Sequence, residues 1–183
     1  MIDYIKAALK FLTKNCSKMK KLIFVRHGRA EESSPLLSDF ERSLTMKGKT
    51  VTQIMALKMK DKEKDLGVII SSPAFRALET AIIFAREFEI DPEEIIMRSN
   101  IYFKLNLNTL SVILSEISDD INTITLFGHN PSFTEMPDRL SKSGCDFLPK
   151  SSVVCLSFKS ETWQGVMHEK GKQEYFLKPD KSL

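Results

Sequence analysis

The sequence predicts an α/β sandwich of three layers, in which a largely parallel sheet is flanked by helices. From Met19 onwards, short apolar runs of strand length alternate with helical stretches, and this alternation is typical of parallel sheets with crossover helices. No linker rich in proline, glycine or serine and no internal repeat divides the chain, so residues 19–183 are predicted to form a single domain. With 183 residues, 42% of them hydrophobic and 28% charged, the chain is long enough for one sizeable core.

The predicted strands are short apolar runs, and helical patterns fill the sequence between them. Continuous apolar runs are typical of strands buried on both faces, and they occur at residues 22–25, 67–71, 121–127 and 152–158. Apolar periodicity and capping residues predict helices at 45–60 with Thr45 as cap, at 73–88 beginning at Pro73, from Asn108 or Thr109 to 117, and briefly after Pro131. A late hairpin is predicted from 162–167 back through 175–177.

Residues 1–18 precede a second possible start at Met19 and are predicted to be an N-terminal extension. Apolar residues recur there at helical spacing. Lysines interrupt them, which argues against a secretory signal. We expect a helix that packs on the domain or a segment absent from the natural protein, and a basic helix at a membrane surface is the alternative.

Charge and cysteine content narrow the function classes. Because 27 basic and 24 acidic residues give a net charge of only +3, spread along the chain, a nucleic-acid partner is not expected. The three cysteines form no CxxC pair and have no histidines at ligand spacing, which favours a reducing, cytoplasmic compartment without a bound metal or cofactor. No apolar window approaches the roughly 18 residues of a transmembrane segment. The oligomeric state stays open.

Charged side chains follow three of the predicted strands at the point where each strand ends. Arg26 and His27 follow the first strand, Arg76 comes shortly after the second, and His129 follows the third. Ligands of open α/β sheets bind outside the carboxyl ends of the strands. Alone, each of these residues is more typical of a solvated surface, but together they predict a pocket in which two guanidinium groups bind a phosphoryl group. A neutral histidine there could act as a nucleophile without a metal.

At these residues the sequence resembles the histidine phosphatase superfamily, also called the phosphoglycerate-mutase-like superfamily, and within it the SixA-type phosphohistidine phosphatases. The resemblance covers residues 19–140, and three motifs carry it, namely Arg26-His27-Gly28, residues 71–80 (SSPAFRALET) and Gly128-His129-Asn130-Pro131. Residues 42–48 (RSLTMKG) resemble a fourth segment, in which Ser43 stands where the family has proline. Pro137, inside the helix after the third motif, is expected to break or kink that helix.

The resemblance implies a phosphoglycerate-mutase-like fold and a metal-independent phosphatase. His27 would attack phosphorus and form a transient phosphohistidine that water hydrolyses, while Arg26, Arg76 and His129 would hold the phosphoryl oxygens. The expected substrate is a phosphorylated protein carrying phosphohistidine, or a small activated phosphate. Two alternatives stay open: a phosphomonoesterase or sugar-phosphate phosphatase, and a non-catalytic module that binds phosphoryl groups.

The proton donor for the leaving group is not evident from the sequence. Larger members of the superfamily supply a glutamate after the second strand-helix unit, but the corresponding residues 97–110 contain no carboxylate. Asp39 and Glu41, and with them Glu31, lie in the loop after the first motif and are candidate acids. Because a missing acid matters most for poor leaving groups such as alkoxides, the sequence favours phosphohistidine or another activated phosphate as substrate.

Overall fold

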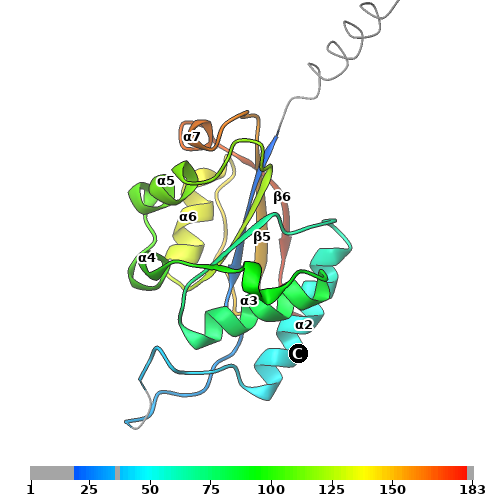
Figure 1. Ribbon diagram of the computed structural model, residues 1–183, viewed down its shortest axis with the longest axis vertical. Coiled ribbons are helices and arrows are strands. Elements are labelled where there is room, and N and C mark those ends of the chain that lie inside the picture. Colours follow the sequence, from blue (N-terminus) through cyan, green and yellow to red (C-terminus); the bar gives the residue numbers. More distant parts are fainter. Residues whose placement is uncertain (1–18, 36–37, 181–183) are drawn as a thin grey trace, which may run out of the picture.

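The computed structural model describes residues 19–35 and 38–180, so the predicted extension at residues 1–18 lies outside the described residues. The described residues form one mixed sheet with helices on both faces (Figure 1). Its strands are β1 (Lys20–Arg26), β2 (Val68–Ser71), β3 (Ile96–Met97), β4 (Thr123–Gly128), β5 (Val153–Phe158) and β6 (Lys172–Leu177). They lie in the order β3-β2-β4-β1-β5-β6. The first four in this order are parallel, whereas β5 is antiparallel to both β1 and β6.

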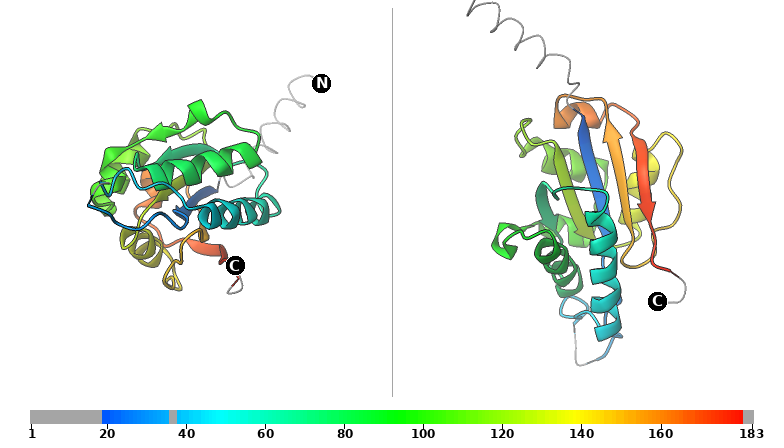
Figure 2. Two further views of the ribbon diagram at one scale, coloured as in Figure 1. Left: turned by 90° about the horizontal axis from the view of Figure 1, so that it is seen from below. Right: turned by 90° about the vertical axis from the view of Figure 1, so that its right-hand side faces the viewer.

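One face of the sheet is covered by α2 (Met46–Lys60) and α3 (Phe75–Glu87), which pack against each other (Figure 2). Successive side chains of a strand point to opposite faces, so β1 contributes Ile23 and Val25 to this side. They pack with Met55 of α2 and Ala81 of α3 in one buried cluster. The apolar run predicted at residues 22–25 therefore serves two cores, one on each side of the sheet.

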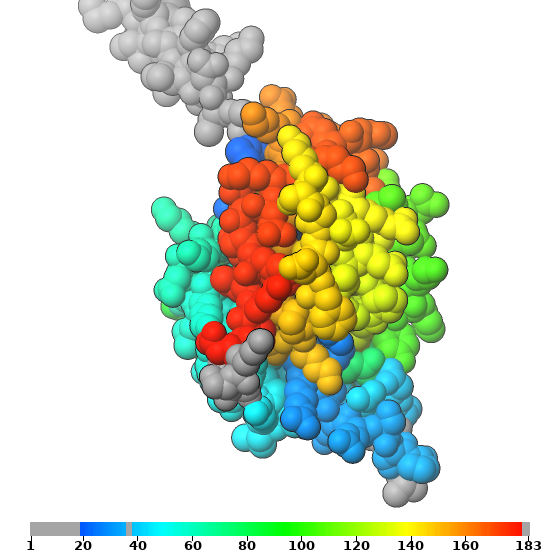
Figure 3. Space-filling view, turned by 180° about the vertical axis from the view of Figure 1, so that it is seen from behind, coloured from blue at the N-terminus to red at the C-terminus, as the bar shows by residue number. Residues whose placement is uncertain are grey.

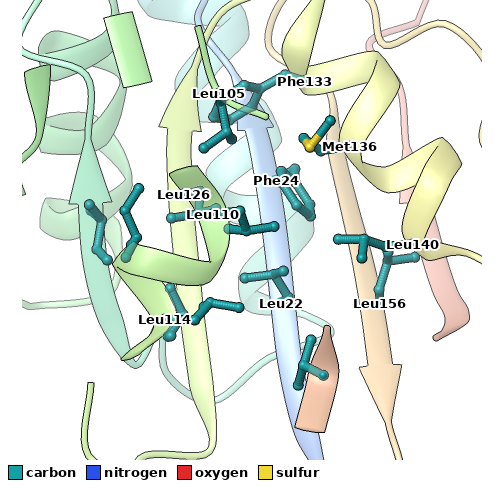
Figure 4. Packing of buried hydrophobic residues seen from close by; sticks show 14 of the residues in the cluster. Leu22, Phe24, Leu105, Leu110, Leu114, Leu126, Phe133, Met136, Leu140 and Leu156 are labelled. Carbon is teal, nitrogen blue, oxygen red and sulfur yellow. The ribbon is translucent and has the colours of Figure 1, made fainter. Parts of the chain in front are cut away.

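The other face is covered by α4 (Ser99–Phe103), α5 (Leu107–Ser115), α6 (Ser132–Leu140) and α7 (Trp163–Val166). A short 3₁₀ helix, η1 (Pro92–Glu94), comes directly before β3. Leu22 and Phe24 of β1 pack on this face with Leu110 and Phe133 (Figure 4). The rings of Phe24 and Phe133 meet edge to face with centroids 5.7 Å apart. The architecture is thus the predicted three-layer α/β sandwich.

Most predicted elements are confirmed, and the late hairpin is wrong in one strand. β1, β2, β4 and β5 match the four predicted strands, and α2, α3 and α5 match the predicted helices within a few residues. Thr45 caps α2 as predicted, since its hydroxyl accepts a hydrogen bond from the Gly48 N–H at 3.0 Å. Residues 162–167 were predicted as a strand, but Thr162 caps the short helix α7 by accepting from the Gly165 N–H. Trp163 is buried in the core, and this tertiary packing outweighs the strand preference of the segment.

Two helix boundaries differ from the prediction, and the helix that contains Pro137 is not broken. α3 begins at Phe75 because Ala74 is still extended, and α5 is capped by Asn106 instead of Asn108 or Thr109. α6 runs from Ser132 to Leu140 with Pro137 inside it. Among the described residues, no helix combines the length and apolar character needed to cross a membrane.

Candidate active site

The three motifs meet because their strands are adjacent and in register. β4 lies between β2 and β1, with Arg26 paired to Gly128 and Ser71 paired to Phe127. The residues that follow continue this pairing, since the His27 N–H donates to the Gly128 carbonyl at 3.0 Å and the Ser72 N–H to the Phe127 carbonyl at 2.9 Å. The sheet therefore brings both histidines to one edge, as predicted from their positions at the carboxyl ends of two strands.

His27 is held as a neutral imidazole with one free ring nitrogen. Its side chain is 8% exposed, and its Nδ1 lies 2.7 Å from the carbonyl oxygen of Gly28. A carbonyl can only accept, so Nδ1 carries the hydrogen and Nε2 keeps its lone pair. Burial, followed by the charge of His129 and then by those of Arg76 and Arg26, lowers the pKa of His27 to about 2, although the hydrogen bond to Gly28 acts in the opposite direction. At neutral pH the ring is uncharged and Nε2 is available as a nucleophile.

His129 faces His27, with ring centroids 5.0 Å apart. Its Nε2 hydrogen-bonds the hydroxyl of Ser72 at 2.8 Å, whereas its Nδ1 is buried and has no partner among the described residues. Burial, followed by the charge of Arg76, lowers the pKa of His129 to about 3. The site thus contains a second neutral imidazole with an unused buried nitrogen.

Arg76 lies in the first turn of α3 and is almost completely buried. Both of its terminal nitrogens donate to Asp39, one to the backbone carbonyl and the other to Oδ2 at 2.8 Å. Two parallel donors are the arrangement that suits a phosphoryl group as well as a carboxylate. In this structure the guanidinium fork therefore holds an anionic group that belongs to the chain itself.

Arg26, at the end of β1, contacts the segment before β5. One terminal nitrogen donates to the carbonyl of Leu148 at 2.7 Å, and the guanidinium lies 5.3 Å from the ring centre of Phe147. Its Nε is buried without a partner in the described part of the chain. The structure thus brings together all four predicted core residues, since the charges of both arginines act on both histidines.

The candidate acids separate into one that reaches the site and two that do not. Asp39 binds Arg76 and also accepts from Arg42 at 2.7 Å. Partial burial raises the pKa of Asp39, but the hydrogen bonds from the two arginines outweigh it and hold the pKa at about 2. Glu41 instead accepts from Ser38, and Glu31 accepts from the backbone of Ser43. Asp39 is therefore ionised at neutral pH, as a ligand of Arg76.

Tyr102 on α4 is a site residue that the sequence did not indicate. Its hydroxyl donates to Oδ2 of Asp39 at 3.2 Å, and its ring meets the ring of His129 edge to face at 5.7 Å. It lies within residues 97–110, which contain no carboxylate and therefore offered no candidate acid of the expected kind. Its phenolic hydroxyl can also carry a proton, and this is the one signal in the sequence that points to it. In residues 19–35 and 38–180, no group of three or more His, Cys, Asp or Glu side chains is placed to hold a metal ion.

These features define a phosphoglycerate-mutase-like α/β fold, the fold of the SixA structures. A putative phosphohistidine phosphatase SixA from Agrobacterium tumefaciens superposes with a TM-score of 0.71 at 22% identity, over 88% of this chain and 99% of the other. The protein histidine phosphatase SixA in complex with tungstate gives a TM-score of 0.73 at 16% identity, over 87% and 97%. A mycobacterial glucosyl-3-phosphoglycerate phosphatase gives 0.60 at 13%, over 85% and 97%.

Sequence comparison adds little to the structural likeness. No known protein-family profile matches the chain. An uncharacterized protein of Picosynechococcus sp. is 37% identical over 65 residues, which is 36% of this chain and 39% of that protein. The match spans less than half of the curated relative, and the identities to the three solved structures above lie below 25%. What the site does is therefore argued from its own geometry.

Proposed function

We propose that this protein is a metal-independent phosphatase of the histidine phosphatase superfamily, acting on phosphohistidine or a small activated phosphate. The observation that carries the proposal is the tautomer of His27, whose Nδ1 is tied to the Gly28 carbonyl so that Nε2 keeps a lone pair. A lone pair beside two arginines is a nucleophile placed at an anion site. The SixA structures with the same fold are described as phosphohistidine phosphatases, which agrees with this chemistry.

The proposed reaction has two steps. His27 Nε2 attacks phosphorus, the bond from phosphorus to the leaving oxygen or nitrogen breaks, and the leaving group departs with the bonding electrons and takes up a proton. Water then attacks phosphorus, the nitrogen–phosphorus bond to His27 breaks, and phosphate is released. Arg26, Arg76 and the unused nitrogen of His129 would hold the phosphoryl oxygens and stabilise their charge. For Arg76 to bind the phosphoryl group in this way, the phosphoryl group must replace the carboxylate of Asp39 as the partner of the guanidinium.

The state of the acid supports an activated substrate. Asp39 carries no proton at neutral pH while it is bound to Arg76, and Tyr102 has a raised pKa, because burial and the hydrogen bond to Asp39 both disfavour its ionised form. Neither group is then a ready donor to an alkoxide. The nitrogen of a phosphoramidate can be protonated from solvent, so phosphohistidine places the smallest demand on this site.

A sugar-phosphate phosphatase is the second candidate, because Asp39 does reach the site and a mycobacterial glucosyl-3-phosphoglycerate phosphatase shares the fold. Such an enzyme needs an acid for its alkoxide leaving group. If Asp39→Asn abolished turnover of alkyl phosphates but not of aryl phosphates, this candidate would replace the first. A non-catalytic module would bind phosphate and turn over nothing in a broad substrate panel.

The test uses two of the three histidines of the chain. We expect His27→Ala to lower the turnover of an aryl phosphate and of a phosphohistidine peptide by about 10³-fold or more, because the nucleophile is lost. The wild-type protein, quenched at alkaline pH during turnover, should retain acid-labile radioactive phosphate. His168→Ala is the matched control, because His168 is exposed beside α7, which packs near the amino end of β1. Full activity of His27→Ala would refute the proposal.

A further inference from the structure

A cavity of about 470 Å³ lies beside the site and shares Arg26 with it. Its lining includes three more cations, Arg29, Lys47 and Lys150, and an apolar wall that contains Phe147 and Pro149. Small-molecule pockets typically measure about 300–1,000 Å³, with apolar walls and a few polar groups that fix orientation. Figure 3 shows the molecule from the side on which the segments of these residues come together, at its lower end.

Within residues 19–35 and 38–180, no acidic side chain pairs with Arg29, Lys47 or Lys150 of this cavity. None of its lining residues is acidic. Burial, followed by the charges of Arg26 and Arg29, lowers the pKa of Lys150. Elsewhere Lys21 and Arg98 each have a glutamate partner. Unpaired cations that face one cavity favour an anion from outside the chain.

Arg26 connects this cavity to the catalytic residues. Its charge acts on both histidines, while its guanidinium lies over the ring of Phe147 in the cavity wall. Phe147 is 62% exposed, so its other surface is open to a ligand. A molecule whose phosphoryl group sits at His27 and whose remainder extends past Arg26 would therefore reach Phe147 and the three further cations.

We propose that this cavity is a second anion subsite, which takes an anionic group covalently attached to the substrate and so selects phosphoryl compounds that carry two separate anionic groups. The inference rests on the proposed function, because the first of the two anionic groups is the phosphoryl group that His27 attacks. The second group is a phosphate or carboxylate of a small molecule, or an acidic side chain next to phosphohistidine in a protein. Both sources present the same chemistry to Lys47 and Lys150.

Binding of non-hydrolysable probes tests the subsite without catalysis. Titration calorimetry would compare propylphosphonate, which has one anionic group, with a bisphosphonate of the same three-carbon length. We expect the bisphosphonate to bind wild-type protein about tenfold or more tightly than propylphosphonate, since it can occupy both sites with charge-assisted hydrogen bonds. Lys47→Ala and Lys150→Ala should reduce this ratio to about twofold, and Lys150→Arg should restore most of it.

Lys62→Ala is the matched control, because Lys62 is exposed on the turn after α2 and outside the cavity. A wild-type ratio near one, or an equal loss of the ratio in the control, would overturn the subsite. Phosphohistidine peptides with aspartate or asparagine neighbours distinguish the protein source from the small molecule by their kcat/KM. If the protein hydrolyses its substrates but shows no preference for the bisphosphonate, only the subsite proposal is refuted. If it prefers the bisphosphonate but hydrolyses no substrate, only the proposed phosphatase activity is refuted.

Discussion

The two histidines of the site change charge in a different pH range from an exposed histidine. Burial lowers the pKa of His27 to about 2 and that of His129 to about 3, and the arginines contribute to both shifts. In the unfolded chain the same rings take up a proton below a pH of about 6.5. Between these values the unfolded state binds more protons than the folded state, so folding stability must fall as the pH is lowered.

We therefore expect acidification to destabilise the protein through this pair. From pH 7 to pH 5, each histidine should remove about 2 kcal/mol from the free energy of unfolding, because its ring must stay neutral in the folded state. Urea unfolding in phosphate-free buffer at several pH values measures the slope. His27→Asn and His129→Asn should each reduce the slope of the free energy of unfolding against pH by about half, and His168→Asn should leave this slope unchanged. An unchanged slope in both site variants would contradict the assigned protonation states.

At the scale of elements, residues 38–41 connect the loop after β1 to the helices of the site. The carbonyl of Phe40 accepts from the Phe75 N–H at the start of α3, and the ring of Phe40 packs on Phe75 and Tyr102. Asp39 is thereby held against Arg76. The carboxylate and an incoming phosphoryl group compete for the same guanidinium.

This competition predicts that Asp39→Asn binds inorganic phosphate more tightly. The amide can still hydrogen-bond but carries no charge, so we expect the dissociation constant for phosphate to fall roughly fivefold, as measured by titration calorimetry. Glu41→Gln is the control, because among the described residues the Glu41 carboxylate accepts hydrogen bonds from Ser38 and not from Arg76. Weaker phosphate binding by Asp39→Asn would mean that Asp39 assists the bound phosphoryl group instead of competing with it.

Element prediction from the sequence succeeded where a buried pattern was long and failed where an element was short. β1, β2, β4 and β5 each contain a largely apolar run. Because a strand buried on both faces needs apolar residues at successive positions, such runs can be recognised in the sequence. β3 has two residues, and α4 and α7 have five and four, too few for a period to show. Tyr102 lies in one of these short helices, so no helical period in the sequence indicated the direction of its side chain.

At the scale of the whole molecule, the site depends on strands that are far apart in the sequence. Parallel strands align their carboxyl ends, so the meeting of Arg26, His27 and His129 could be predicted because each of them follows a predicted strand. The contacts of Asp39 and the direction of Arg26 toward Leu148 could not, since they depend on how irregular segments pack. A ligand bound among these residues would hold the ends of β1, β2 and β4 together, and its binding should be measurable as global stability.

We therefore expect inorganic phosphate to stabilise the folded protein by mass action. At about 100 times the dissociation constant, the free energy of unfolding should rise by about 2.7 kcal/mol, which for a chain of this size raises Tm by roughly 5–10 °C. Arg76→Ala should lose most of this increment, because the buried guanidinium is a main partner of the anion. Arg86→Ala, an exposed arginine on the same helix, should retain it. Phosphate also stabilises proteins non-specifically by exclusion from their surface, and this contribution is common to both variants. Only the difference between them reports on the site, and equal stabilisation of both would place the bound phosphate elsewhere.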